Sequence, residues 1–126
     1  MKFGVMEGRS MYQREIGHII VQILKSATGK GPSFVRVSLS ENILIVDIKG
    51  ALTAMERTLL KDSIGNLGLI RIIRKKIMES AMNEFVNQLQ EVTHIADLNV
   101  NRCNIEIDYE NDRLIMIFIC NQFLPE

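Results

Sequence analysis

The sequence predicts an α+β domain with a four-stranded, largely antiparallel sheet packed with helices, in the order α-β-β-α-α-β-β. Apolar residues recur with the helical period in residues 16–27 and 70–92, and they alternate with period two in residues 35–48 and 98–120. Two strands, two helices and two strands in succession are typical of an α+β arrangement. The 126 residues, of which 47% are hydrophobic and 24% charged, fit one globular domain that spans 1–126.

The first helix has a single apolar stripe and a clear end. The stripe consists of Ile16, Ile19, Ile20, Ile23, Leu24 and Ala27. Ser10 is a candidate N-cap. Gly29 can adopt the left-handed conformation that ends a helix, and Pro32 cannot continue it. We therefore expect a positive φ at Gly29.

Two alternating runs predict a β-hairpin after this helix. Residues 35–39 and 44–48 place apolar side chains at every second position, and the polar residues 40–42 lie between the runs. Gly50 closes the hairpin.

A short helix is expected near Thr53–Lys61, because Thr53 and Glu56 have the spacing of a capping box. Its predicted buried side consists of Leu52, Met55, Leu59 and Leu60. Residues 62–68 contain two glycines and predict a loop.

The longest predicted element is one helix over residues 69–93, which would be roughly 35 Å long at 1.5 Å per residue. Its apolar residues keep the three-four spacing throughout: Ile70, Ile73, Ile77, Met78, Ala81, Met82, Phe85, Leu89 and Val92.

The last third predicts two more strands. Residues 101–102 interrupt the alternation and suggest a β-bulge, and residues 108–112 form a strong turn signal. Residues 114–120 are apolar on both faces, which is typical of a strand inside a sheet with both sides covered. The helices of one chain cover one side, so we expect a homodimer or higher oligomer. The residues expected on the second face are Phe34, Ile115, Ile117 and Ile119.

Composition limits the function classes. The net charge is zero, which gives no bulk electrostatic case for binding nucleic acid or anionic lipid. Residues 1–10 lack the apolar region of a signal peptide, and the run 114–120 is too short to span a bilayer, so we expect a cytoplasmic protein. Cys103 and Cys120 are expected to be reduced, buried thiols that do not pair.

No catalytic constellation, cofactor site or metal site is predicted. Gly29-Lys30-Gly31 follows a helix and precedes a strand, the reverse of a phosphate-binding loop, and Pro32 replaces the second glycine of an RNA-binding GxxG loop. His18 with Glu15, and His94 with Asp97, would each supply two metal ligands where a site normally requires three or four. The acidic residues expected to form a solvated tip are Glu106, Asp108, Glu110 and Asp112.

A basic cluster at the start of the predicted long helix consists of Arg71, Arg74, Lys75 and Lys76. Positive charge there opposes the helix dipole, which favours either a solvated face paired with Glu79 or an acidic partner that docks on these residues.

Several segments resemble the MpsC family, small bacterial proteins named as a component of a sodium-translocating, membrane-potential-generating system. The resemblance rests on Gly29-Lys30-Gly31-Pro32, on the strand with Val35 and Val37, and on residues 52–56 with Thr53 and Glu56. It covers roughly residues 12–119. The family pattern has Pro at position 54 and Gly at position 94, where this chain has Ala54 and His94.

The resemblance implies a non-catalytic accessory protein that docks on a membrane ion-translocating complex. The alternative from a different class is a regulatory module that binds a small molecule or nucleic acid.

Overall fold

The computed structural model describes residues 5–7 and 11–125, with side chains from residue 13. The predicted cap Ser10 lies outside the described residues. The elements are β1 (Val5–Glu7), α1 (Met11–Thr28), β2 (Phe34–Ser40), β3 (Ile43–Lys49), α2 (Ala54–Asp62), α3 (Leu67–Ser80), α4 (Met82–Thr93), β4 (Val100–Asp108) and β5 (Arg113–Cys120).

The sheet has the strand order β1-β2-β3-β5-β4. The pairs β2–β3, β3–β5 and β4–β5 are antiparallel, which confirms the predicted α+β class and four-stranded antiparallel sheet. The short β1 adds a parallel edge strand beside β2 that the sequence did not predict.

The predicted turns and the bulge are present. Glu41 takes a left-handed conformation (φ 57°) in the β2–β3 turn, and Asp112 does so (φ 50°) before β5. The register of β4 against β5 shifts between Val100 and Arg102, as the broken alternation predicted. Gly29 has the expected positive φ of 77° at the end of α1.

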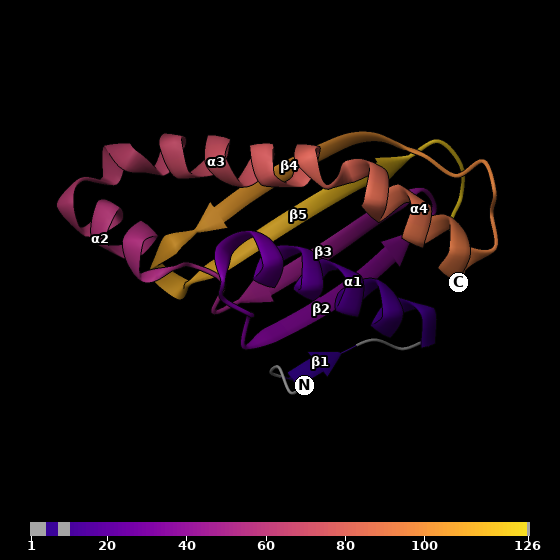
Figure 1. Cartoon of the computed structure of the whole chain (residues 1–126), viewed down its shortest axis with the longest axis horizontal. Coiled ribbons are helices and arrows are strands. Elements are labelled where there is room, and N and C mark those ends of the chain that lie inside the picture. Colours follow the sequence, from indigo (N-terminus) through magenta and orange to yellow (C-terminus); the bar gives the residue numbers. More distant parts are fainter. Residues whose placement is uncertain (1–4, 8–10, 126) are drawn as a thin grey trace.

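The core lies between the sheet and the helices. Figure 1 shows α1, α3 and α4 on the same side of the strands. Val46 and Met116 on the central strands and Ile20 on α1 are fully buried. The rings of Phe85 on α4 and Phe118 on β5 lie 4.8 Å apart between centroids. Burial of these side chains provides the main stabilisation of the fold.

The opposite face of the sheet carries a stripe of isoleucines. Cross-strand pairing joins Ile43 to Ile119 and Ile45 to Ile117, with Ile115 next in line. Their side chains are half-buried or exposed, whereas the residues between them on the same strands are buried against the helices. Among the described residues no helix covers this stripe.

The predicted single helix over residues 69–93 is wrong in one respect: the chain bends at Ala81 (φ −94°, ψ 0°), between α3 and α4. The hydrogen bonds from Ala81 N to Ile77 O (3.1 Å) and from Phe85 N to Ala81 O (2.9 Å) persist across the bend. α3 contacts β4 whereas α4 contacts α1, and a straight helix would not follow both surfaces. The predicted loop 62–68 includes a 3-10 turn at Ile64–Asn66, and α3 begins at Leu67.

Candidate functional site

The connection between β3 and α2 is held at Gly50, Ala51 and Leu52 by groups from distant parts of the chain. Gly50 N donates to Asp112 O (2.9 Å), and Leu52 N donates to Asp112 Oδ1 (3.0 Å). Leu52 O accepts from Lys30 Nζ at 3.0 Å. Buried backbone groups need such partners, so this extended segment is fixed relative to α1 and to the β4–β5 turn.

The capping box predicted at Thr53 and Glu56 is confirmed. Glu56 N donates to Thr53 Oγ1 (3.2 Å), and Thr53 N donates to Glu56 Oε1 (2.8 Å). The reciprocal bonds satisfy two amides at the start of α2 that have no partner within the helix.

Arg74 of α3 joins this cap in a buried ion pair. Its Nε donates to Glu56 Oε2 (2.8 Å), and its Nη2 donates to Glu56 Oε1 and to Ala51 O (both 2.6 Å). The Arg74 side chain is 1% exposed, and its Nη1 is buried without a hydrogen-bond partner among the described residues. Burial tends to raise the pKa of Glu56, but hydrogen bonds from Arg74 and Thr53 outweigh it and hold that pKa below its ordinary value. The pair therefore stays ionised and fixes α3 against the start of α2.

The predicted basic cluster divides as a result. Arg74 is not available to a partner, so its assignment to a docking surface does not hold. Arg71 Nε lies 3.6 Å from a Glu106 oxygen, and Lys76 Nζ lies 3.9 Å from a Glu79 oxygen. Lys75 is exposed, and no ion pair is recorded for it among the described residues.

The motif Gly29-Lys30-Gly31-Pro32 has a structural role here. Gly29 N donates to Lys25 O (2.8 Å), and Lys30 N donates to Thr28 Oγ1 (3.2 Å) as the helix ends. Pro32 is buried ahead of β2. Together with the Lys30 bond to Leu52, these contacts connect the end of α1 to the start of α2.

Asp112 is a structural residue that the sequence did not identify. It was expected in a solvated acidic tip, but its carboxylate accepts from Leu52 N and forms an ion pair with Arg57 Nη1 (3.0 Å). Its partners lie 55 and 60 residues away in the chain, so no local pattern indicates them.

The remaining chemical candidates stay apart. His94 is the left-handed C-cap of α4 (φ 59°), at the position where the resembling family has Gly, and His18 is exposed on α1. No group of three His, Cys, Asp or Glu side chains within the described ranges lies close enough to hold a metal ion. Cys103 and Cys120 are free thiols, as predicted, but only Cys120 is fully buried and Cys103 is half-buried. Burial raises the pKa of Cys103 to about 11.

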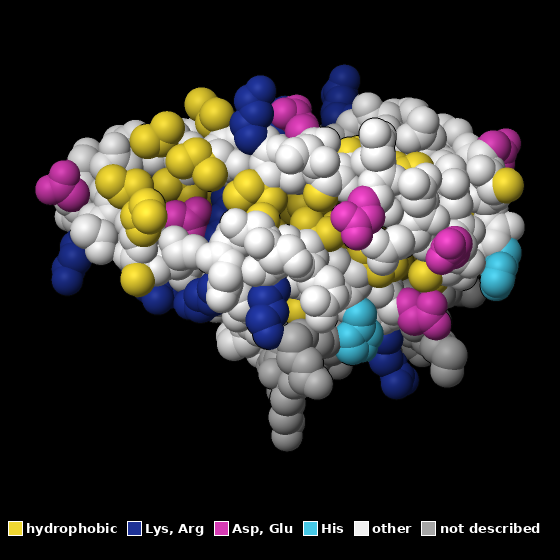
Figure 2. Space-filling model, viewed as in Figure 1, with side chains coloured by type: hydrophobic (Ala, Val, Ile, Leu, Met, Phe, Trp, Pro, Cys, Tyr) yellow, Lys and Arg dark blue, Asp and Glu magenta, His cyan; other side chains and the backbone are white. Residues whose placement is uncertain are grey.

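An exposed apolar surface lies on α2 and α3, here named the α2–α3 patch. It consists of Met55, Ile64, Leu69, Ile72 and Ile73. Met55 is 73% exposed, so the prediction that it is buried is wrong. Ile73 keeps the three-four apolar spacing of the helix yet is 42% exposed. Figure 2 shows hydrophobic side chains gathered at the left of the molecule, where Figure 1 places α2 and the start of α3.

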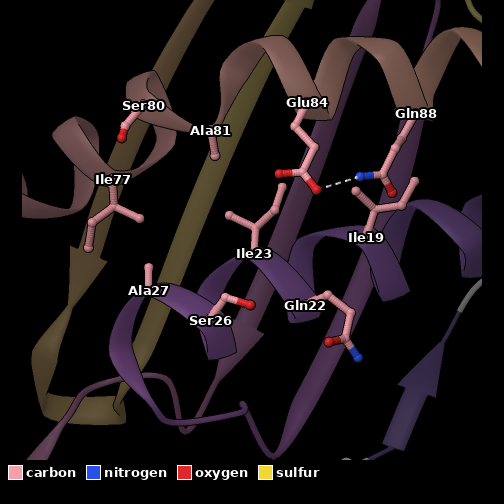
Figure 3. Close-up of a pocket in the computed structure, with 10 residues that line it drawn as sticks. All are labelled: Ile19, Gln22, Ile23, Ser26, Ala27, Ile77, Ser80, Ala81, Glu84 and Gln88. Atoms are coloured by element: carbon pink, nitrogen blue, oxygen red, sulfur yellow. Dashed lines mark hydrogen bonds between the residues drawn. The ribbon is translucent and has the colours of Figure 1, made fainter.

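A groove of about 350 Å³ lies between α1 and the bend from α3 to α4. Ile23 and Ile19 of α1 lie opposite Glu84 and Gln88 of α4, and the Glu84 carboxylate accepts from Gln88 Nε2 at 3.2 Å (Figure 3). Small side chains at the bend, Ser80 and Ala81, leave this space open. None of the predicted site residues lines it.

No helix in the described part of the chain is long and apolar enough to cross a membrane.

Comparison with known proteins identifies the family of the chain. No curated protein and no solved structure matches the chain. Residues 8–122 match the family described as Na+-translocating membrane potential-generating system (MpsC). Since this range covers nearly the whole chain, the protein belongs to the MpsC family.

Proposed function

We propose that this chain is a non-catalytic accessory protein of a sodium-translocating, membrane-potential-generating system, located on the cytoplasmic side of the membrane. The family match over residues 8–122 is the observation that carries the proposal. Glu56, Arg74 and Asp112 form hydrogen bonds that hold separate elements of the fold together. The exposed features are surfaces for contact: the α2–α3 patch and, beside it, Lys75 and Lys76.

The docking surface that we propose centres on α3. The spacing i, i+3, i+4, i+7 places Leu69, Ile72, Ile73 and Lys76 on one side of the helix, with Lys75 beside them. Large apolar side chains exposed together with positive charge are typical of a surface that contacts a partner protein or a membrane.

We also propose that the chain forms a homodimer through the isoleucine stripe. Ser38 and Ser40 of β2 border the stripe on one side, and Arg102 and Asn104 of β4 border it on the other. Asp47 accepts two hydrogen bonds from Arg113, at 2.8 and 2.7 Å, so this charged pair near the stripe is compensated. An apolar centre with a polar rim is the usual anatomy of a protein interface.

The size of this face favours a weak dimer. Four strands of about seven residues give a projected area of roughly 450 Å² per copy. Two copies would bury on the order of 1,000 Å² in total, at the lower limit of specific interfaces. Sedimentation at tens of micromolar, as a rough working range, should detect a dimer that Ile117→Lys abolishes and the rim variant Ser38→Lys does not. A monomer at every concentration would contradict the dimer.

The accessory role is tested in cells that carry the sodium-translocating system. We expect deletion of this chain to reduce the sodium-dependent potential of inverted membrane vesicles, and added purified chain to restore it. Retention of the chain on native membranes at low salt should accompany the restoration. An unchanged potential after deletion would contradict the proposal, and salt-sensitive binding to RNA or DNA would favour the alternative of a regulatory binding module.

A further inference from the structure

We infer that the α2–α3 patch binds the surface of an anionic lipid bilayer. The inference rests on the proposed function only for the presence of a membrane, and it adds the lipid as a direct ligand of this protein. The observation that carries it is a group of five protruding aliphatic side chains bordered by lysines on consecutive elements.

The patch has the composition of an interfacial anchor. Exposed fractions range from 42% for Ile73 to 59% for Ile72 on α3, and Ile64 in the preceding turn is 54% exposed. All five members are aliphatic or methionine, and none has a hydrogen-bonding group that would specify a polar partner. A bilayer accepts such side chains into its headgroup boundary without a matching pocket, whereas a protein partner requires shape complementarity.

The charge near the patch is positive although the chain is neutral. Residues 54–80 carry six basic and three acidic side chains. The ion pairs Glu56–Arg74, Arg57–Asp112, Arg71–Glu106 and Lys76–Glu79 compensate four of the six basic side chains, so Lys61 and Lys75 remain against one acidic side chain, Asp62. Lys61 and Lys75 are exposed, with no ion pair recorded for them in the described part of the chain. Basic residues beside an apolar face are attracted to anionic headgroups, which distinguishes this patch from a purely hydrophobic contact.

The position of the patch suits a flat surface. Figure 1 shows α2 and the start of α3 at one end of the long axis of the molecule, and Figure 2 shows the apolar atoms there with Lys and Arg side chains nearby. The bonds from Arg74 to Glu56 and Ala51 hold α2 and α3 rigidly together beneath the patch. The apolar side chains are therefore presented as one surface, and little conformational entropy is lost on binding.

Flotation with protein-free vesicles tests the inference. We expect the full chain to float with vesicles of phosphatidylcholine and phosphatidylglycerol, and to bind vesicles of phosphatidylcholine alone much more weakly. The double variant Ile72→Ser, Ile73→Ser should bind on the order of tenfold more weakly. Phe123→Ser is the matched control, because Phe123 is 66% exposed but lies near the C-terminus, outside the patch, and this variant should bind normally.

Charge-reversal variants distinguish electrostatic attraction to the lipid headgroups from insertion of the apolar side chains. Lys75→Glu with Lys76→Glu should lower binding by at least about fivefold per residue at low salt, and Arg14→Glu on α1 should not. Thermal melts of each variant check that the fold is kept.

The inference is overturned if the full chain binds neither kind of vesicle. It is also overturned if the Ile72/Ile73 double variant binds as well as the Phe123 variant. The chain could instead fail to bind vesicles but be retained on native membranes, and lose that retention when the membranes are treated with protease. This result would assign the patch to a protein partner and leave the accessory role standing. If the chain binds vesicles but its deletion leaves the sodium-dependent potential unchanged, the inference stands and the proposed function fails.

Discussion

The two sides of α3 use similar residues for different purposes. On the inner side, Arg74 is 1% exposed and contacts Glu56 and Ala51, while on the outer side Lys75 and Lys76 lie in solvent next to Ile72 and Ile73. The inner side joins α3 to α2 and to the end of β3. The outer side presents an apolar, basic surface.

This difference shows that a run of basic residues in the sequence does not by itself indicate which of them are available for binding. Consecutive residues on a helix are turned about 100° from one another, so Arg74 and Lys75 face different surroundings although they are neighbours in sequence. A basic residue acts structurally where a distant acid meets it, as Glu56 meets Arg74. It is free for binding where the nearest groups are solvent.

The largest difference between the two sides is expected in stability. Arg74→Ala removes one partner of a buried ion pair and leaves Glu56 uncompensated, so the free energy of unfolding should fall by about 3–5 kcal/mol. Lys75→Ala changes a surface side chain and should alter it by less than about 0.5 kcal/mol. Urea melts of the two variants check this, and similar losses for both would remove the distinction.

The stability of the inner side also depends on the backbone of residues 50–53. Substitution of Gly50 in this segment, compared with substitution of Gly29 at the end of α1, tests this dependence. Gly50 has φ 72°, and a Cβ there would lie 2.4 Å from Ser33 Oγ and 3.1 Å from Ser33 N. Gly50→Ala should therefore cost about 2–4 kcal/mol from strain and overlap. Gly29 has a similar φ with no atom within 4 Å of such a Cβ, so Gly29→Ala should cost only about 1 kcal/mol. A neutral Gly29→Ala would contradict its role as a C-cap, and a Gly50→Ala cost no larger than that of Gly29→Ala would contradict the overlap.

Thr53→Ala measures how much the capping box contributes to the stability of the inner side. The variant loses the hydroxyl that accepts from Glu56 N, while Arg74 still holds the Glu56 carboxylate. We expect a loss of about 1 kcal/mol in urea melts. Thr58→Ala on the exposed side of α2 serves as the control, and an equal loss there would show that the cap is not the cause.

The ionised Glu56 predicts an acid dependence of stability. Its pKa lies below the ordinary value of 4.5 in the folded chain, so the carboxylate binds protons more readily in the unfolded chain. Its contribution is thus present above about pH 4.5 and is lost as the pH falls through the lower folded value. The stability advantage of the parent chain over Glu56→Gln should shrink across that interval in melts recorded at stepwise lower pH. A constant difference would indicate that folding does not lower the pKa of Glu56.

Local patterns predicted the parts of the fold whose causes are local. The alternation in residues 35–48, the spacing of Thr53 and Glu56, and the turn before β5 each depend on neighbours in sequence, and each is confirmed. The family could also be predicted, because its motif residues fix these same local features.

The remainder depends on contacts between distant segments. The bend at Ala81 has no Gly or Pro to mark it, because the change in packing surface from β4 to α1 causes it. Met55 and Ile73 follow the helical apolar pattern yet face solvent, since Glu56, Arg74 and Leu60 already occupy the inner side of α2 and α3. Arg74 differs from the rest of the basic cluster because it contacts Glu56, which is 18 residues away in the chain, and no local pattern predicts that contact.

We expect the outer side of α3 to bind the membrane, whereas the inner side stabilises the fold. The most direct measurement pairs urea unfolding with retention on native membranes at low salt for one double variant, Lys75→Glu with Lys76→Glu. We expect a free energy of unfolding within about 0.5 kcal/mol of that of the parent chain, together with loss of membrane retention. Undiminished retention, or a loss of stability as large as that of Arg74→Ala, would contradict it.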